Sequence, residues 1–116
     1  MSVSEFAHNL AFVIGINQYG NGIPPLQTAV NDAHAIATLL ETKHNYHVEQ
    51  MIDQTATLDR LQYWLQITLP NQVVDDDRVL IYFAGHGIAH QANDGPAGYL
   101  VPQDAIPADT STFLPM

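Results

Sequence analysis

The chain has 116 residues, of which 47% are hydrophobic and 13% charged, which is typical of one globular domain or part of one and not of a disordered tail. Its net charge of -9, from 3 basic and 12 acidic residues, argues against nucleic-acid binding and mildly favours basic substrates or partners. The absence of cysteine excludes disulfides, thiolate metal sites and a cysteine nucleophile on this polypeptide.

No segment approaches the ~20 consecutive apolar residues that a membrane-spanning helix needs. The first five residues, Met1-Ser2-Val3-Ser4-Glu5, lack the basic and apolar regions of a signal peptide. We therefore expect a cytoplasmic protein with no membrane partner. We see no internal repeat, low-complexity tract or linker, so residues 1–116 are treated as one unit.

Short apolar runs alternate with segments of helical periodicity along the chain. The runs predict buried strands, and Pro70 is expected to end the second helix, for which Thr57 is a plausible N-cap. In chain order we predict a strand at 11–16, a polar loop at 17–22, a helix at 26–42, a strand at 47–52, a helix at 58–69, a strand at 78–84, a polar loop at 85–90 and a short apolar piece at 99–101.

This alternation of strands and helices predicts a three-layer α/β/α sandwich with a mainly parallel sheet, to which the chain supplies three main strands and an edge piece. Sites in such sheets form beyond the carboxyl ends of the strands. The loops 17–22 and 85–90 emerge at those ends, so we expect the functional site between them.

His86 is the strongest candidate for chemistry. It stands between Gly85 and Gly87 at the end of an apolar strand, where glycine allows close approach of another chain. A neutral imidazole exchanges a proton at cellular pH, and the Gly87 N–H could point at a developing oxyanion. The simpler interpretation is a loop histidine that caps a strand. No serine stands in a strand-to-helix elbow, which disfavours a serine hydrolase.

Four ordered segments are distributed along nearly the whole chain: AFVIGINQY at 11–19, PL at 25–26 with AVNDA at 29–33, DRVLIYFAGHG at 77–87, and GYLVPQDA at 98–105. Together they resemble caspase-like peptidases, and most closely bacterial metacaspases (orthocaspases). The resemblance implies a caspase-like fold that is incomplete in this chain, with residues 1–116 as the amino-terminal, histidine-bearing portion of one catalytic domain.

The resemblance also implies roles for individual residues. His86 corresponds to the histidine of a His–Cys dyad, Gly87 contributes an N–H to the oxyanion hole, and Gly85 removes bulk where the substrate passes. The family's cysteine follows the next strand, so we expect it on a carboxy-terminal remainder that acts as a partner of this chain. Asn17 and Tyr19 could line the substrate cleft.

Asp32 and Leu26 lead to two further expectations, one about structure and one about substrate preference. At about 100° per residue Asp32 falls within the apolar arc that Ile36, Leu39 and Leu40 define on the first helix, and a buried carboxylate needs hydrogen bonds. We therefore expect it to tie the helix start to the loop 17–22. In animal caspases an arginine six residues before this aspartate binds an acidic substrate side chain. Leu26 stands there instead, which favours the Arg/Lys preference of metacaspases at the residue before the cleaved bond.

We expect no metal site and no cofactor. His86 and His90 have i, i+4 spacing, but the intervening Gly-Ile-Ala is a poor helix for a zinc site. Asp75-Asp76-Asp77 has a calcium-loop composition without the ordered ligand spacing and is interpreted as a solvated turn. Calcium binding stays an alternative, because some metacaspases bind calcium through acidic residues between the dyad histidine and the cysteine. In this chain Asp94, Asp104 and Asp109 lie in that span.

Two functions remain. The first is a cysteine endopeptidase that acts on peptide or protein substrates, with His86 as general acid and base and the thiol supplied from outside these residues. The alternative is a catalytically inactive caspase-homology module that serves as an interaction or scaffolding domain.

Overall fold

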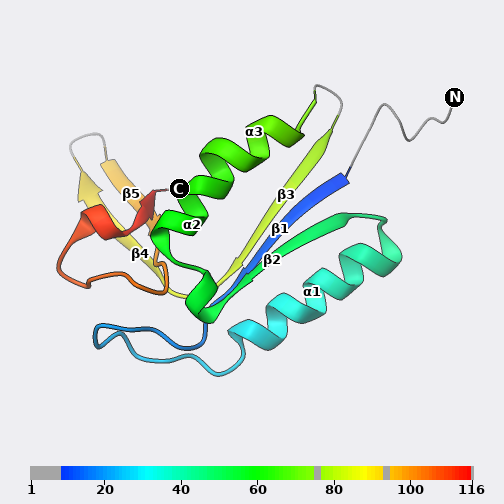
Figure 1. Cartoon of the computed structure of the whole chain (residues 1–116). Helices are drawn as coiled ribbons and strands as arrows, with labels where there is room; N and C mark the ends of the chain where they lie inside the picture. The colour runs from blue at the N-terminus through cyan, green and yellow to red at the C-terminus, as the bar shows by residue number, and fades with distance from the viewer. Residues whose placement is uncertain (1–8, 75–76, 93–94, 116) are drawn as a thin grey trace, which may run out of the picture.

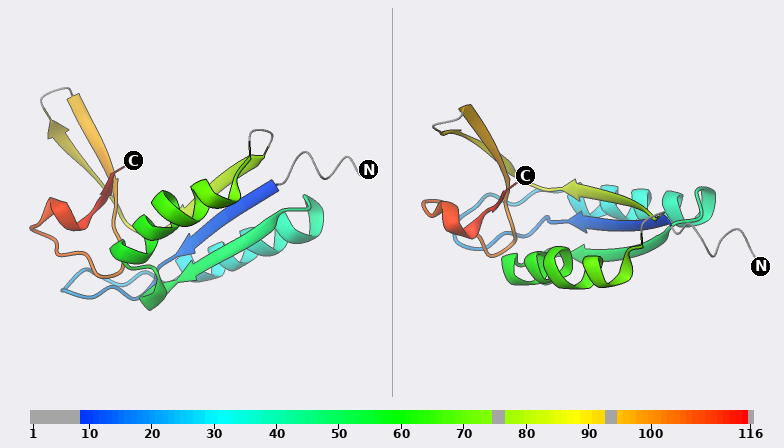
Figure 2. Two further views of the ribbon diagram at one scale, coloured as in Figure 1. Left: turned by 45° about the horizontal axis from the view of Figure 1, so that its top comes forward. Right: turned by 90° about the horizontal axis from the view of Figure 1, so that it is seen from above.

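The computed structural model describes residues 9–74, 77–92 and 95–115. Its centre is a sheet of three parallel strands in the order β2-β1-β3 (Figure 1). These strands are β1 (Asn9–Gly15), β2 (His47–Ile52) and β3 (Arg78–Ala84). Helices lie on both faces of the sheet, as the right-hand view of Figure 2 shows, which confirms the predicted three-layer α/β/α architecture.

The central strand β1 is buried on both faces. Phe12 and Ile14 belong to the core on one face, where the Trp64 ring stacks on Phe12 at 3.9 Å between centroids. Ala11 and Val13 point to the opposite core, which includes residues of the helix α1 (Ala29–Lys43). Burying each large apolar side chain contributes about 1.5–3 kcal/mol, so this two-faced strand anchors the fold. Trp64 is buried and the neighbouring Tyr63 is exposed.

The first helix begins later than predicted, at Ala29 rather than residue 26. The reason is the side chain of Asn17, whose Oδ1 accepts a hydrogen bond from the Val30 N–H at 3.1 Å. The Leu26 N–H also donates to the Asn17 carbonyl at 2.8 Å. These two bonds hold residues 26–28 in the loop and make Asn17 the link between the loop and the helix start.

The expectation for Asp32 was wrong. Its side chain is exposed, because the buried face of α1 is formed by Ala29, Ala33, Ala37 and Leu40. Leu39, which had widened the predicted apolar arc, is itself 45% exposed. Asp32 therefore lies beyond the edge of the true buried arc.

The second helical region covers the other face of the sheet, but it is not one continuous α-helix. It consists of α2 (Leu58–Tyr63), a π-helical segment (Trp64–Thr68) and α3 (Leu69–Gln72). Thr57 caps α2 as predicted, accepting a hydrogen bond from the Arg60 N–H at 3.4 Å. Pro70 lies in the first turn of α3, where its missing N–H is tolerated, so the helical path continues past it to Gln72.

The residues after β3 form a second sheet rather than a loop and an edge piece of the first one. Its strands are antiparallel in the order β4-β5-β6, namely β4 (Gly87–Ala92), β5 (Gly95–Leu100) and β6 (Leu114–Pro115). The predicted loop 85–90 is thus a short turn followed by β4, and the apolar piece at 99–101 is the end of β5. Figure 1 shows this hairpin at the end of the parallel sheet where β3 ends.

In the described part of the chain, β3 pairs only with β1, so its other edge is open. Val79 and Ile81 on this strand are 39% and 49% exposed. An open strand edge favours pairing with a further strand, and these exposed side chains leave part of one sheet face uncovered. None of the described helices has both the length and the apolar character needed to cross a membrane.

Candidate active site

The carboxyl ends of the three parallel strands bring distant loops together. β1 leads into the loop that starts at Asn17, and β2 leads into Asp53, whose backbone has a left-handed φ of 49°. One carboxylate oxygen of Asp53 accepts the Asn17 N–H at 2.7 Å and the Gln18 N–H at 3.0 Å. Asp53 therefore fixes the start of the loop that carries Tyr19 and Pro24.

His86 lies at the carboxyl end of β3, in the turn before β4, and is partly exposed. Its Nε2 lies 2.9 Å from the carbonyl oxygen of Pro24. Because a carbonyl can only accept, the neutral ring carries its proton on Nε2 in this arrangement. No described residue hydrogen-bonds to Nδ1, so the lone pair of that nitrogen is available to take a proton.

The hydroxyl of Tyr19 fixes the backbone of the same turn. It accepts the His86 N–H at 2.8 Å and lies 3.1 Å from the carbonyl oxygen of Val101, to which it donates. The Val101 N–H donates back to the His86 carbonyl at 3.0 Å. The phenol oxygen thus bridges the His86 N–H and the Val101 carbonyl, which would otherwise bond directly to each other in the ladder. The phenol ring lies tilted against the imidazole, with 5.0 Å between the ring centroids.

Burial raises the pKa of the Tyr19 phenol above its ordinary value. The hydrogen bond from the His86 N–H acts in the opposite direction, and the negative charge of Asp53 adds to the rise. The phenol therefore stays protonated at neutral pH and can donate to the Val101 carbonyl.

Gly85 has no room for a side chain. A Cβ at this position would lie 2.6 Å from the Tyr19 hydroxyl oxygen and 2.8 Å from a ring carbon of Phe83. The glycine is therefore required by the close approach of Tyr19 to the backbone before His86.

Gly87 is exposed and begins β4, which in the described part of the sheet is an edge strand. It pairs with Leu100, next to the hydrogen-bonded pair formed by His86 and Val101. Because hydrogen-bonded and non-hydrogen-bonded pairs alternate along an antiparallel ladder, the Gly87 N–H points away from β5.

The structure brings all five predicted site residues to one end of the sheet. The polar groups of Asn17 and Tyr19 are already engaged, however: the Asn17 side chain holds the start of α1, and the Tyr19 hydroxyl holds the turn at His86. Both residues shape the site through the protein's own backbone.

Two of the acidic residues considered for calcium, Asp104 and Asp109, accept hydrogen bonds from the protein itself. The Asp104 carboxylate accepts the Leu58 N–H, and the Asp109 carboxylate accepts the N–H and the hydroxyl of Ser111. Asp75, Asp76 and Asp94 lie outside the described residues, as does the side chain of His90. Within the described ranges, no three His, Asp or Glu side chains form a group that could hold a metal ion.

Two contributors to the site were missed from the sequence. Pro24 acts through its carbonyl, which every residue type has, so its identity gave no signal beyond the stiffness of the Pro24-Pro25 pair. Asp53 could have been found, because a carboxylate directly after the second strand must lie at the same sheet end as the other loops.

The family model of the caspase domain of peptidase C14 matches residues 8–115. A comparison with curated proteins gave no match.

Proposed function

The chain belongs to the caspase-domain family of peptidase C14, and on this premise we propose that it is the histidine-bearing portion of a metacaspase-like cysteine endopeptidase. The observation that carries the proposal is the presentation of His86. Its Nε2–H is fixed on the Pro24 carbonyl, and its Nδ1 has no partner among the described residues. An imidazole held in one tautomer with one free nitrogen has the form that a general base requires.

The chemistry divides into proton transfer and attack. Nδ1 of His86 takes the proton from a thiol, and the thiolate attacks the carbonyl carbon of the peptide bond. The Gly87 N–H, which points away from β5, donates to the oxyanion that forms, and one such donor contributes about 3–4 kcal/mol in comparable sites. His86 then gives the proton to the leaving amine, and water hydrolyses the thioester. These steps use an imidazole and a thiol, so we expect no cofactor.

The thiol must come from outside these residues, because the chain has no cysteine. We propose that it lies on the carboxy-terminal remainder of the same catalytic domain, after a strand that pairs with the open edge of β3. The unpaired edge of β3 in the described part of the sheet supports this place. A parallel strand beside β3 would end at the same end of the sheet as His86, and the thiol would follow it.

We also propose that the enzyme cleaves after Arg or Lys. The net charge of -9 attracts basic peptides. Leu26 stands where animal caspases of this family carry the arginine that binds an acidic side chain, so the feature that favours Asp is missing. The carboxylate that would pair with the basic side chain is expected near the thiol, outside this chain.

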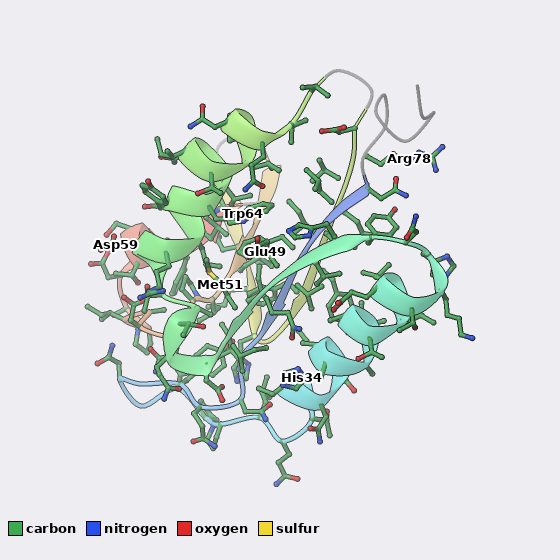
Figure 3. All side chains as sticks on the ribbon, turned by 45° about the vertical axis from the view of Figure 1, so that its right-hand side comes forward. His34, Glu49, Met51, Asp59, Trp64 and Arg78 are labelled. Carbon is green, nitrogen blue, oxygen red and sulfur yellow. The ribbon has the colours of Figure 1, made fainter. Side chains whose placement is uncertain are left out.

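The test is peptide hydrolysis by the protein assembled with its thiol-bearing remainder. We expect cleavage of Arg- and Lys-ended fluorogenic peptides, and a loss of at least about a hundredfold in kcat/KM for His86→Ala. The matched control is His34→Ala, because His34 is an exposed histidine on α1 (Figure 3). Its Nδ1 lies 3.0 Å from Oε1 of Gln50. The chain without the remainder should be inactive.

Two results would contradict the proposal. A loss of less than tenfold in His86→Ala would remove the general-base role. Absence of cleavage from the assembled protein, with a residue other than cysteine after the next strand, would support the alternative, an inactive caspase-homology module for protein interaction. The absence of cysteine from this chain is the observation that keeps this alternative in view.

A further inference from the structure

A pocket of about 120 Å³ opens beside the imidazole of His86. Its walls come from the loop after β1, the turn before β4, β4 itself and the segment after β5. Apart from His86, the side chains that line it are aliphatic, aromatic or proline, and they include Ile23, Ile88, Val101 and Phe113.

The lining selects for apolar groups. Among the described residues of the wall, His86 is the only titratable one, and its Nε2 is already bonded to the Pro24 carbonyl. A lysine, arginine or aspartate side chain would lose hydration there without gaining a charged partner. An aliphatic side chain would exchange water for contact with Ile88 and Phe113, which is favourable.

The size of the pocket sets the size of the group. A protein cavity of about 150 Å³ is known to hold benzene, so 120 Å³ suits a side chain the size of valine or leucine. The described wall offers no carboxylate, which a basic side chain would need as a partner.

The wall contains both His86 and Gly87, which are the proton carrier and the oxyanion donor of the proposed mechanism, so the pocket lies beside the bond to be cleaved. This step rests on the proposed function. His86 must lie within hydrogen-bond distance of the leaving amine in order to protonate it. That nitrogen belongs to the residue directly after the cleaved bond, and the side chain of this residue branches from the adjacent Cα atom.

We infer that this pocket binds an aliphatic side chain at the position directly after the cleaved bond, so that the enzyme recognises a basic residue followed by an aliphatic one. Ile88 and Phe113 are then determinants of specificity that act independently of the pocket for the basic residue.

The experiment uses internally quenched peptides and the protein assembled with its thiol-bearing remainder. All peptides carry Arg before the cleaved bond, and the following residue is Gly, Ala, Val, Leu, Asp or Lys. We expect kcat/KM for Leu or Val to exceed that for Gly by about tenfold, and Asp and Lys to fall below Gly.

Variants at the pocket test its role directly. Ile88→Phe fills part of the space and should reduce the ratio of Leu to Gly to less than about threefold. The matched control is Ile106→Phe, because Ile106 is 47% exposed and does not line the pocket. The control should keep the wild-type ratio. Should Ile88→Phe fail to fold, the wild-type peptide series decides by itself.

The outcomes separate this inference from the proposed function. Equal cleavage of the Gly and Leu peptides, or a preference confined to the residue before Arg, overturns the inference and leaves the peptidase intact. Cleavage of no peptide in the series, Arg- and Lys-ended reporters included, overturns the proposed function and the inference with it.

Discussion

Removing one oxygen atom, in Tyr19→Phe, should uncouple the backbone at His86 from the segment at Val101. The hydroxyl accepts the His86 N–H at 2.8 Å and donates to the Val101 carbonyl at 3.1 Å. Phenylalanine keeps the ring and its contact with the imidazole but makes neither bond. The N–H of His86 and the carbonyl of Val101 then face each other across the space the oxygen occupied.

The magnitude follows from those two bonds. Each intramolecular hydrogen bond contributes about 1 kcal/mol net, and a partly buried N–H without a partner adds about 1 kcal/mol or less. We expect the free energy of unfolding to fall by about 2–3 kcal/mol, against a total of about 5–15 kcal/mol for an ordinary domain. The amide of His86 should also exchange its hydrogen faster, because its protection depends on the phenol.

Gly85→Ala probes the same oxygen from the other side. The new Cβ would lie 2.6 Å from the hydroxyl oxygen and 2.8 Å from a ring carbon of Phe83. The substitution therefore displaces the phenol and strains Phe83, at a cost of about 3 kcal/mol. In the Tyr19→Phe background the first clash is absent, so Gly85→Ala should cost at least about 1 kcal/mol less.

Urea denaturation of the purified wild-type protein, both single variants and the double variant measures all four corners of this cycle. Tyr63→Phe is the matched control, because Tyr63 is 61% exposed, and its effect should stay within about 0.5 kcal/mol. The reasoning is refuted if Tyr19→Phe is as stable as the control, or if the effects of Tyr19→Phe and Gly85→Ala simply add.

Two further predictions concern the same end of the sheet. Asp53→Ala removes the acceptor of the Asn17 and Gln18 N–H groups and places alanine at a φ of 49°, so the free energy of unfolding should fall by about 2–3 kcal/mol. Asp53→Asn keeps an acceptor and tolerates this φ, so in the same urea titration its loss should be less than half of that. Because the pKa of Tyr19 is raised in the folded chain, the protonated phenol contributes to the free energy of unfolding. This contribution is fully present below the pKa of the phenol in the unfolded chain, about 10, and is lost as the pH rises through the pKa in the folded chain. Urea midpoints between about pH 8 and 11 should fall more steeply for the wild type than for Tyr19→Phe, and equal slopes would contradict the pKa shift.

The parallel sheet could be predicted because its strands are short apolar runs. Phe12 and Val13 are both buried although they point to opposite faces, so the run shows no alternation, and such runs are typical of strands covered by helices on both sides. The hairpin β4–β5 could not be predicted in the same way, because its glycines, alanines and Pro96 carry neither alternation nor β-branched residues.

The same contrast explains the errors in the helices. The true buried face of α1 is made of alanines, which give a weak periodic signal, so the more hydrophobic Leu39 shifted the predicted arc and drew Asp32 into it. The later start of α1 depends on Asn17, which is twelve residues away in sequence from Ala29 and is brought there by the fold.

The residues of the site could be predicted from the sequence, but the hydrogen bonds between them could not. His86 was placed at a strand end from its neighbours alone, since the topology of parallel sheets fixes where such ends lie. Its tautomer, by contrast, depends on a carbonyl 62 positions away, and its backbone on a phenol 67 positions away. Backbone carbonyls carry no sequence signal, and a tyrosine that bridges two backbone groups resembles one that lines a cleft. The reactivity of this histidine is therefore set by contacts that only the folded chain creates, and Tyr19→Phe changes those contacts while leaving every residue of the proposed dyad in place.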